Sequence, residues 1–288
     1  MVDLLGGVQK VMRQMLVARG VESTLVRVAG QTLHSYRLEG EGSGPPVLLV
    51  HGLGGSANGF ARTFFGLAKR FRRVLAVDLP GHGFSPELCG GPICVQAHFD
   101  VLQAYCRQVV REPAYVVGNS LGGAMAVELG AQAPELVRAL ALVAPAGADL
   151  PPGRIDAVLH DMIGVRTASD ARALTRRLFH APPLPLMLFA HELRKFYGTP
   201  TVRALAEEAL EARAALSPEV LGGLKMPTLL LWGGSEKLLP NESLDYFRAH
   251  LPAHAAIEVV PGFGHIPQME RPAELVSHLV SFADASGL

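Results

Sequence analysis

The sequence predicts an α/β fold: a mostly parallel, doubly wound sheet into which a block of helices is inserted. Two observations support this. Short apolar runs alternate with helix-forming segments along most of the 288 residues, a rhythm typical of right-handed βαβ units. Between residues 147 and 217 no apolar strand run occurs, and the rhythm then resumes. We therefore expect one core domain, formed by residues 23–146 and 218–288, with a helical insertion at 147–217.

An amphipathic helix is predicted at the N-terminus, over residues 1–22. Its apolar side chains recur at helical spacing, and its basic residues lie elsewhere on the helix surface. The apolar residues are Leu4, Val8, Val11, Met12, Met15 and Leu16. We expect this face to pack on the domain. Peripheral contact with a membrane surface and contact with a partner chain stay open as other uses of it.

The remaining elements follow from local patterns in chain order. Alternating or β-branched segments predict a hairpin, fully apolar runs predict buried parallel strands, and the segments between them predict helices. The predicted strands are 23–28, 31–38, 47–50, 73–77, 114–117, 140–143, 228–232 and 257–260, with the hairpin turn at Ala29-Gly30. The predicted helices are 60–71, 99–110, 121–133 and 273–282 in the core, and 154–163, 171–179 and 202–215 in the insertion.

Composition restricts the partners and the compartment. Lys plus Arg and Asp plus Glu number 26 each, so the chain has no basic footprint for nucleic acid. No apolar run approaches the roughly 18 residues that span a membrane, and the N-terminal segment does not resemble a signal peptide. The three cysteines, Cys89, Cys94 and Cys106, form no Cys-x-x-Cys pair. Their odd number argues against a disulfide framework and favours a reducing, cytoplasmic compartment.

The most informative stretch is Gly118-Asn119-Ser120-Leu121-Gly122, which directly follows an apolar strand and precedes a helix-forming run. Gly-x-Ser-x-Gly in a strand–turn–helix context is typical of a nucleophile elbow. The two glycines have no Cβ, so they permit the close backbone approaches that such a sharp turn needs. We therefore predict that Ser120 is a catalytic nucleophile. The alternative is a glycine-rich turn without chemistry.

A serine hydroxyl is a weak nucleophile and needs an adjacent base, for which His265 is the candidate. It lies in a loop between the last strand and the last helix, on the same carboxyl edge of the sheet as Ser120. The base in turn needs an acid that fixes its tautomer. Glu236 is the only carboxylate in its loop before Pro240, and we assign it this role. Asp149, which follows the preceding strand, is the rival.

An oxyanion that develops during acyl transfer needs preorganised donors. We predict that one donor is the backbone N–H of Leu121, the residue after the nucleophile. The other is expected from the glycine-rich loop that follows strand 47–50, with the N–H of Leu53 as the candidate. A flexible glycine-rich turn is compatible with this role, because the donor belongs to the backbone.

No cofactor or metal motif is complete. The glycine-rich loop lacks the last glycine of a dinucleotide fingerprint, because position 57 is Ala. His191-Glu192 begins like a zinc-binding His-Glu-x-x-His motif but lacks the second histidine. His250 and His254 are separated by a proline, and no third ligand is evident. We therefore expect neither a cofactor nor a metal.

Taken together, the motifs resemble those of the α/β-hydrolase superfamily over nearly the whole chain. They occur in the family's order of serine, acid and histidine. The matching segments are 51–55, 78–85, 118–123, 232–236 and 264–265. The resemblance implies that residues 147–217 form a helical cap over the active site, and that Asp78 and His82 hold a structural turn. The family usually has Asp where this chain has Glu236.

The resemblance also implies a reaction. With a serine nucleophile it implies a carboxylesterase or lipase-like hydrolase of small-molecule esters, acting through an acyl-enzyme on Ser120 with His265 as general base. A serine at this position excludes the related haloalkane dehalogenases and epoxide hydrolases, which attack with Asp. The apolar run 184–189 is expected to line a pocket for an apolar acyl chain or form a mobile lid, or else to be the small core of the cap itself.

Two alternatives come from the same motifs. The elbow is also similar to that of hydrolases that break carbon–carbon bonds in dienoate ring-cleavage products, but those enzymes typically have Trp after the catalytic histidine, where this chain has Ile266. An acyltransferase could use the same triad. From another class, a non-catalytic relative could bind a small molecule or a protein. Acyl length, alcohol identity and oligomeric state are not encoded by these motifs.

Overall fold

A central sheet of eight strands organises the molecule, which we describe from a computed structural model covering residues 4–212 and 215–288. The strands are β1 Glu22–Val28, β2 Gln31–Glu39, β3 Val47–Val50, β4 Arg73–Val77, β5 Ala114–Asn119, β6 Val137–Val143, β7 Thr228–Gly233 and β8 Ala256–Val260. Their order is β1-β2-β4-β3-β5-β6-β7-β8. Only the pairs β1–β2 and β2–β4 are antiparallel, so the predicted mostly parallel sheet is confirmed.

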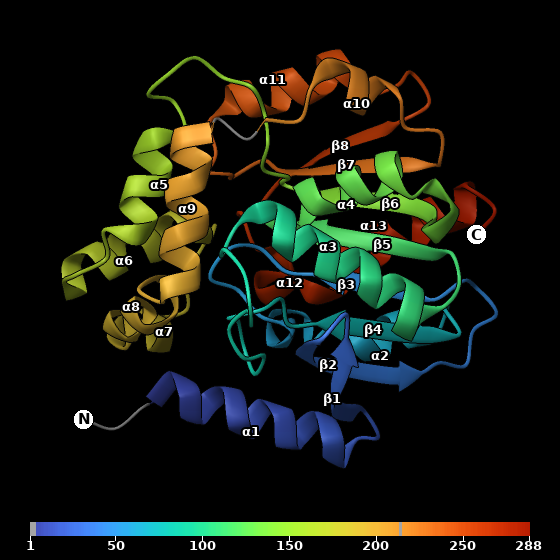
Figure 1. Cartoon of the computed structure of the whole chain (residues 1–288), viewed down its shortest axis with the longest axis horizontal. Helices are drawn as coiled ribbons and strands as arrows, with labels where there is room; N and C mark the ends of the chain where they lie inside the picture. Colours follow the sequence, from blue (N-terminus) through green and yellow to red (C-terminus); the bar gives the residue numbers. More distant parts are fainter. Residues whose placement is uncertain (1–3, 213–214) are drawn as a thin grey trace.

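Helices cover both faces of the sheet, as a doubly wound arrangement requires (Figure 1). The core helices are α2 Phe64–Ala68, α3 Val95–Tyr105, α4 Leu121–Gln132, α10 Pro218–Gly222, α11 Asn241–His250, α12 Pro267–Glu270 and α13 Pro272–Ala285. Successive side chains of a strand point to opposite faces. In β3, Leu48 and Val50 accordingly join the core under α3 and α4, while Val47 and Leu49 join the core under α2 and α13. Both faces of β3 are buried, which explains its uninterrupted apolar sequence.

The hairpin and two helices show how closely local patterns predict element ends. Ala29 and Gly30 both have positive φ, 47° and 80°, which is the two-residue turn that matches strand twist. The helix predicted over 60–71 is instead a 3₁₀ turn, Ala57–Phe60, followed by the short α2. Helix α3 begins earlier than predicted, because the Cys94 sulfur accepts the N–H of Ala97 and caps it.

Residues between β6 and α10 form only helices and loops where the structure describes them. The helices are α5 Asp156–Ile163, α6 Ala168–Leu178, α7 Leu184–Leu188, η4 Ala190–Leu193, α8 Arg194–Tyr197 and α9 Pro200–Ala212. They stand together at one end of the sheet, at the left of Figure 1. Helix α6 begins with a capping box between Thr167 and Asp170, which fixes its first turn. Residues 213–214 of the predicted helix 202–215 lie outside the described residues.

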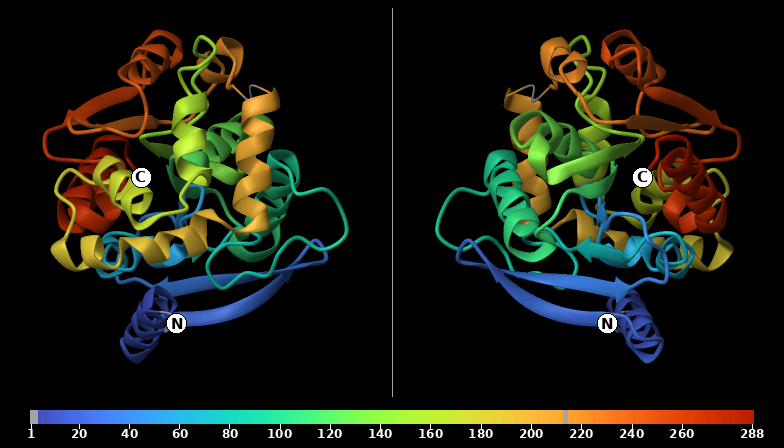
Figure 2. Two further views of the ribbon diagram at one scale, coloured as in Figure 1. Left: turned by 90° about the vertical axis from the view of Figure 1, so that its left-hand side faces the viewer. Right: turned by 90° about the vertical axis from the view of Figure 1, so that its right-hand side faces the viewer.

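The N-terminal helix α1, Leu4–Ala18, lies beside β1 at the edge of the molecule (Figures 1 and 2). The expectation that its apolar face packs on the domain is only partly right. Leu16 is buried and Met12 packs against the core. The exposed residues of the predicted face are Leu4, Val8, Val11 and Met15. The domain therefore covers one edge of the apolar face and leaves the other in solvent. Residues 1–3 of the predicted helix lie outside the described part of the chain.

Candidate active site

Ser120 occupies the turn between β5 and α4 in a strained conformation. Its φ is 55° and its ψ is −119°, a region that residues with a Cβ rarely adopt. Hydrogen bonds from neighbouring elements hold it there. The Ser120 N–H donates to Val143 O at 3.1 Å, and the Ser120 carbonyl accepts from Gly123 and Ala146 at 2.8 and 3.0 Å. The strain is thus maintained by β6 and by the first turn of α4.

The two glycines of the elbow are required by space. A Cβ on Gly118 would lie 2.2 Å from Gly122 O, and a Cβ on Gly122 would lie 2.3 Å from Val50 O. Both distances join a side-chain atom to backbone, which cannot swing away. The pattern Gly-x-Ser-x-Gly is therefore a steric consequence of packing α4 against β5 and β3, as the sequence analysis expected.

His265 and Glu236 form a buried pair. The distance between His265 Nδ1 and Glu236 Oε2 is 2.9 Å, and the two side chains are 3% and 1% exposed. The other carboxylate oxygen accepts the backbone N–H groups of Leu238 and Leu239, at 2.7 and 3.0 Å. Burial alone would raise the pKa of Glu236, but the charge and hydrogen bond of His265, with these two N–H groups, hold it below its ordinary value.

This pairing defines the tautomer of His265. An ionised carboxylate can only accept, so Nδ1 carries the proton and donates to Glu236, which leaves Nε2 as a proton acceptor. Ser120 and His265 line the same cavity. The rival acid Asp149 is exposed and lines the other cavity at Ser120, which His265 does not line. The structure therefore brings Glu236, and not Asp149, to the imidazole.

Asn119, to which the sequence analysis gave no role, ties the elbow to the histidine loop. Its side-chain amide donates to Val143 O and to His265 O, each at 3.0 Å. Its carbonyl oxygen accepts from Gln268 Nε2 at 2.9 Å. The only signal in the sequence was a polar residue inside an apolar strand end, which by itself names no partner. Asn119 thus fixes the distance between the loops that carry Ser120 and His265.

The two predicted oxyanion donors, Leu53 and Leu121, line one cavity together with Ser120. Within the described residues, neither backbone N–H has a hydrogen-bond partner. The Leu53 loop is fixed by His51, whose Nδ1 lies 2.8 Å from Gly52 O and whose Nε2 accepts the N–H of Leu79 at 3.0 Å. Burial lowers the pKa of His51 and keeps it neutral, as both hydrogen bonds require.

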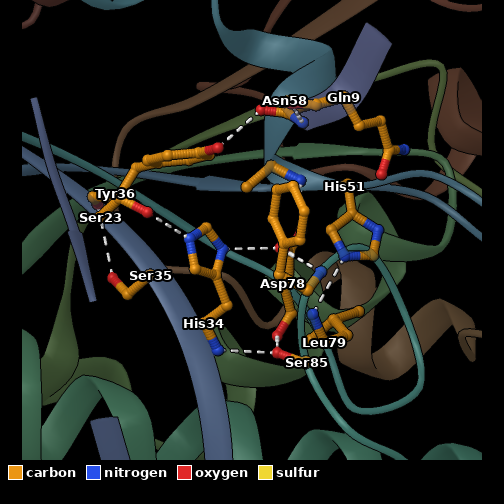
Figure 3. A network of polar contacts seen from close by, with 12 residues as sticks. Gln9, Ser23, His34, Ser35, Tyr36, His51, Asn58, Asp78, Leu79 and Ser85 are labelled. Atoms are coloured by element: carbon orange, nitrogen blue, oxygen red, sulfur yellow. Dashed lines mark hydrogen bonds and ion pairs between the residues drawn. The ribbon is translucent and has the colours of Figure 1, made fainter. Parts of the chain in front are cut away.

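Asp78 lies at the centre of the polar network behind this loop (Figure 3). Its carboxylate accepts from His34 Nδ1 at 2.8 Å and from the backbone N–H groups of Ala57 and Phe84 at 2.6 and 3.0 Å. Burial opposes ionisation, but the hydrogen bond and charge of His34, with its other partners, hold the pKa of Asp78 below its usual range. Neither Asp78 nor His34 lines the cavities at Ser120, so this network supports the loop that carries Leu53 and does not contact substrate.

Two cavities meet at Ser120, with volumes of about 170 and 200 Å³. Leu53, Ser120, Met162 and Leu238 line both. The first extends under α5 and α9, and the second extends toward α1, α7 and α8. Of the apolar run 184–189, only Leu186 lines a cavity, and α7 contributes no buried residue. Leu186 also packs against the core, whereas Leu184, Leu188 and Phe189 are exposed, so the run contributes little to either a cavity or a cap core.

Helix α6 connects the insertion to the acid and base loops. The backbone N–H of His265 donates to Leu178 O at 2.9 Å, and Arg177 donates to the carbonyl oxygens of Lys237 and Leu238 at 3.1 and 3.2 Å. Any movement of α6 therefore acts directly on both loops.

In the part of the chain that the structure describes, no group of three or more His, Cys, Asp or Glu residues could hold a metal ion. No described helix is both long and apolar enough to cross a membrane.

Known proteins share this architecture. The sequence profile of the α/β-hydrolase fold family matches residues 45–272. A pimeloyl-[acyl-carrier protein] methyl ester esterase of Neisseria meningitidis is 30% identical, over 82% of this chain and 90% of that protein. The solved structure of a membrane phospholipase A, described as a bacterial virulence factor, superposes with a TM-score of 0.82 at 28% identity, covering 98% of this chain and 91% of that one.

Similarity also extends to a longer protein with another activity. The dihydrolipoyllysine-residue acetyltransferase component of an acetoin cleaving system is 28% identical in Pseudomonas putida and 27% identical in Cupriavidus necator. The chain spans 70% of the first protein and 61% of the second. These relatives show that similar sequences occur in proteins with different activities.

Proposed function

Because the chain belongs to the α/β-hydrolase fold family, we propose that it is a serine hydrolase of the esterase or lipase type, cleaving carboxylic esters through an acyl-enzyme on Ser120. One observation carries the proposal: Ser120 sits in a strained elbow and shares an apolar cavity with His265, whose Nδ1 is held by the buried Glu236. Two relatives, a methyl ester esterase and a phospholipase A, support an ester as the substrate.

The proposed mechanism follows from the tautomer. His265 Nε2 accepts the proton of Ser120 Oγ while Oγ attacks the ester carbonyl, and Glu236 stabilises the imidazolium that forms. The tetrahedral intermediate collapses, the bond to the leaving oxygen breaks, and His265 returns the proton to that oxygen. Water then repeats the sequence on the acyl-enzyme and releases the acid. We assign the stabilisation of the oxyanion in both halves to the N–H groups of Leu53 and Leu121, two residues that line a cavity with Ser120.

Hydrolysis of p-nitrophenyl esters from acetate to palmitate tests this function. We expect hydrolysis by the native chain and, for Ser120→Ala, a loss of about three orders of magnitude or more in kcat. Folding of the variant is checked by circular dichroism. Hydrolysis that survives in the variant would exclude the serine mechanism. Turnover of dienoate ring-cleavage products, without hydrolysis of any ester, would show that the reaction is carbon–carbon hydrolysis instead. A folded protein inert to both would favour a binding role.

We also propose a reducing, cytoplasmic location. Cys89, Cys94 and Cys106 are all free thiols in the structure. Cys89 is exposed, and an oxidising compartment would leave it open to intermolecular pairing.

The substrate is expected to be a small-molecule ester with an apolar acyl chain, since apolar side chains predominate around both cavities.

A further inference from the structure

The two cavities at Ser120 differ in one chemical respect. The cavity toward α1 is lined by His265, together with Ile266 and Gln268, whereas the cavity under α5 and α9 is not. The cavity under α5 and α9 is lined instead by Leu121 and Ala124 at the start of α4 and by Leu205 and Ala209 of α9. We call the cavity with His265 the α1 arm and the other the α9 arm.

We propose that the α1 arm receives the leaving alcohol of the ester and the α9 arm receives the acyl chain. This rests on the proposed function. In acylation a bond forms between Ser120 Oγ and the carbonyl carbon, and the bond from that carbon to the alcohol oxygen breaks. The alcohol oxygen takes the proton from His265 Nε2, so it must lie on the side of Ser120 where the imidazole lies. The acyl chain then extends the other way, past the N–H of Leu121.

Helix α1 is consequently a specificity element. Its residues Leu5, Val8, Gln9 and Met12 line the α1 arm, and it lies entirely outside residues 45–272, which match the family profile. The helix also contacts the insertion at η4, in which the side chain of Glu192 is buried. One part of the wall of the leaving-group site is thus formed by an N-terminal segment that lies outside the residues matching the family profile.

A crossed substitution experiment tests the assignment. Ala209→Phe fills the α9 arm, and Met12→Trp fills the α1 arm, with Val8→Trp as a second variant should Met12→Trp fail to fold. One substrate series varies the acyl chain with a fixed alcohol, and the other varies the alcohol chain with a fixed acetyl group. In both series, hydrolysis is measured by the release of acid. The measured quantity is the dependence of kcat/KM on chain length in each series.

We expect Ala209→Phe to lower kcat/KM for long acyl chains by about tenfold or more, and to leave the dependence on alcohol length unchanged. Met12→Trp should do the reverse. The opposite pattern, or equal effects of each variant on both series, would overturn the assignment. Failure of the proposed function would appear differently, as no ester hydrolysis by the native chain.

A second inference comes from the outer surface of α1. The exposed stripe of α1, formed by Leu4, Val8, Val11 and Met15, lies on the helix surface that the domain leaves uncovered. Helix α7 adds Leu184 and Leu188, which are 80% and 69% exposed. Val8 is both exposed and part of the cavity wall, so the α1 arm reaches the surface at this stripe. An apolar surface of this kind marks a binding site.

Charge indicates what the stripe binds. Helix α1 and the turn after it contain Lys10, Arg13 and Arg19 and no Asp or Glu between residues 4 and 19, and α8 adds Arg194, whereas Lys195 of α8 is paired with the buried Glu192. Apolar side chains beside basic ones are typical of a helix that lies in the interface of an anionic membrane. We infer that the exposed stripe of α1 docks on an anionic lipid surface, with the mouth of the α1 arm facing the lipid.

Binding to vesicles tests this inference without measuring catalysis. The native chain should sediment with vesicles of phosphatidylglycerol and phosphatidylcholine, bind phosphatidylcholine vesicles more weakly by about tenfold or more, and be released by high salt. Val11→Glu with Met15→Glu should abolish binding, while the matched control Leu25→Glu, at an exposed apolar site on β1, should not. Equal binding to both vesicle types, no binding, or an equal loss in the control would overturn it. So would a native dimer that Val11→Glu with Met15→Glu dissociates, because the stripe would then bind a second copy.

Discussion

At the scale of single residues, the length of the Glu236 side chain is matched by the backbone around it. One carboxylate oxygen reaches the imidazole of His265, and the other is held by the N–H groups of Leu238 and Leu239. Both oxygens of the buried carboxylate therefore accept hydrogen bonds, which keeps it ionised. The backbone of its own loop thus positions Glu236, so its extra methylene does not move the carboxylate away from His265.

Glu236→Gln should lower kcat by about three orders of magnitude, because a neutral amide no longer fixes the tautomer or stabilises the imidazolium. The matched control is Asp149→Asn, which removes a carboxylate near the other cavity and should leave kcat within about twofold. Steady-state kinetics on one ester substrate compare the two, with thermal unfolding as a check on folding. A large loss in Asp149→Asn, with none in Glu236→Gln, would reverse the assignment of the acid.

Asp78 makes a prediction about stability and pH. Its pKa in the folded chain lies below the ordinary value of 3.8, so its contribution is fully present above that pH and is lost as pH falls through the lower, folded value. Asp78→Asn should reduce the free energy of unfolding by about 3 kcal/mol at neutral pH, because it leaves His34 and two N–H groups without a charged acceptor.

Urea unfolding at several pH values measures this difference. The gap between native chain and variant should be constant near neutrality and narrow below pH 3.8. A gap that widens as the solution becomes acidic would contradict the assigned direction of the pKa shift. Asp149→Asn serves here too as the control, since that side chain is exposed and has no comparable network.

At the scale of elements, the strands were predicted more closely than the helices. Strand β4 has the predicted bounds, because the apolar, buried residues Val74–Val77 follow the half-buried Arg73 directly. Helix ends depend on caps that a pattern of apolar residues does not contain. Helix α3 is capped by the sulfur of Cys94. The turn before α2 is fixed by Asp78, a residue of a distant loop, whose carboxylate accepts the N–H of Ala57.

The elbow gives a prediction about packing within one helix. Gly122→Ala should destabilise the chain by about 2 kcal/mol or more, because its Cβ would lie 2.3 Å from Val50 O. Gly130→Ala is the matched control on the same helix, where the nearest atoms to the Cβ would be side-chain ends of Leu140 and Leu224 at 3.1 Å and of Met226 at 3.3 Å. Denaturant unfolding distinguishes the two. Similar midpoints for both variants would show that the elbow has more space than the structure gives it.

At the scale of the whole molecule, the sequence placed Ser120, Glu236 and His265 at one edge of the sheet by topology alone, and the structure brings them together there. It did not predict the forked cavity or the exposed side of α1. Both arise where segments far apart in sequence meet, such as Leu5 with Leu186 or Leu53 with Ala209. Motifs report local backbone requirements, whereas cavity shape depends on how side chains from several elements pack.

The central claim is that Ser120 is an activated nucleophile, and labelling with a fluorophosphonate tests it most directly. The reagent bonds to a serine only when a base removes the hydroxyl proton, so it reports activation without a choice of substrate. We predict one covalent adduct per chain, mapped to Ser120 by peptide mass spectrometry, and no adduct in Ser120→Ala. A folded native chain that stays unlabelled, or carries the adduct on another residue, would contradict the account.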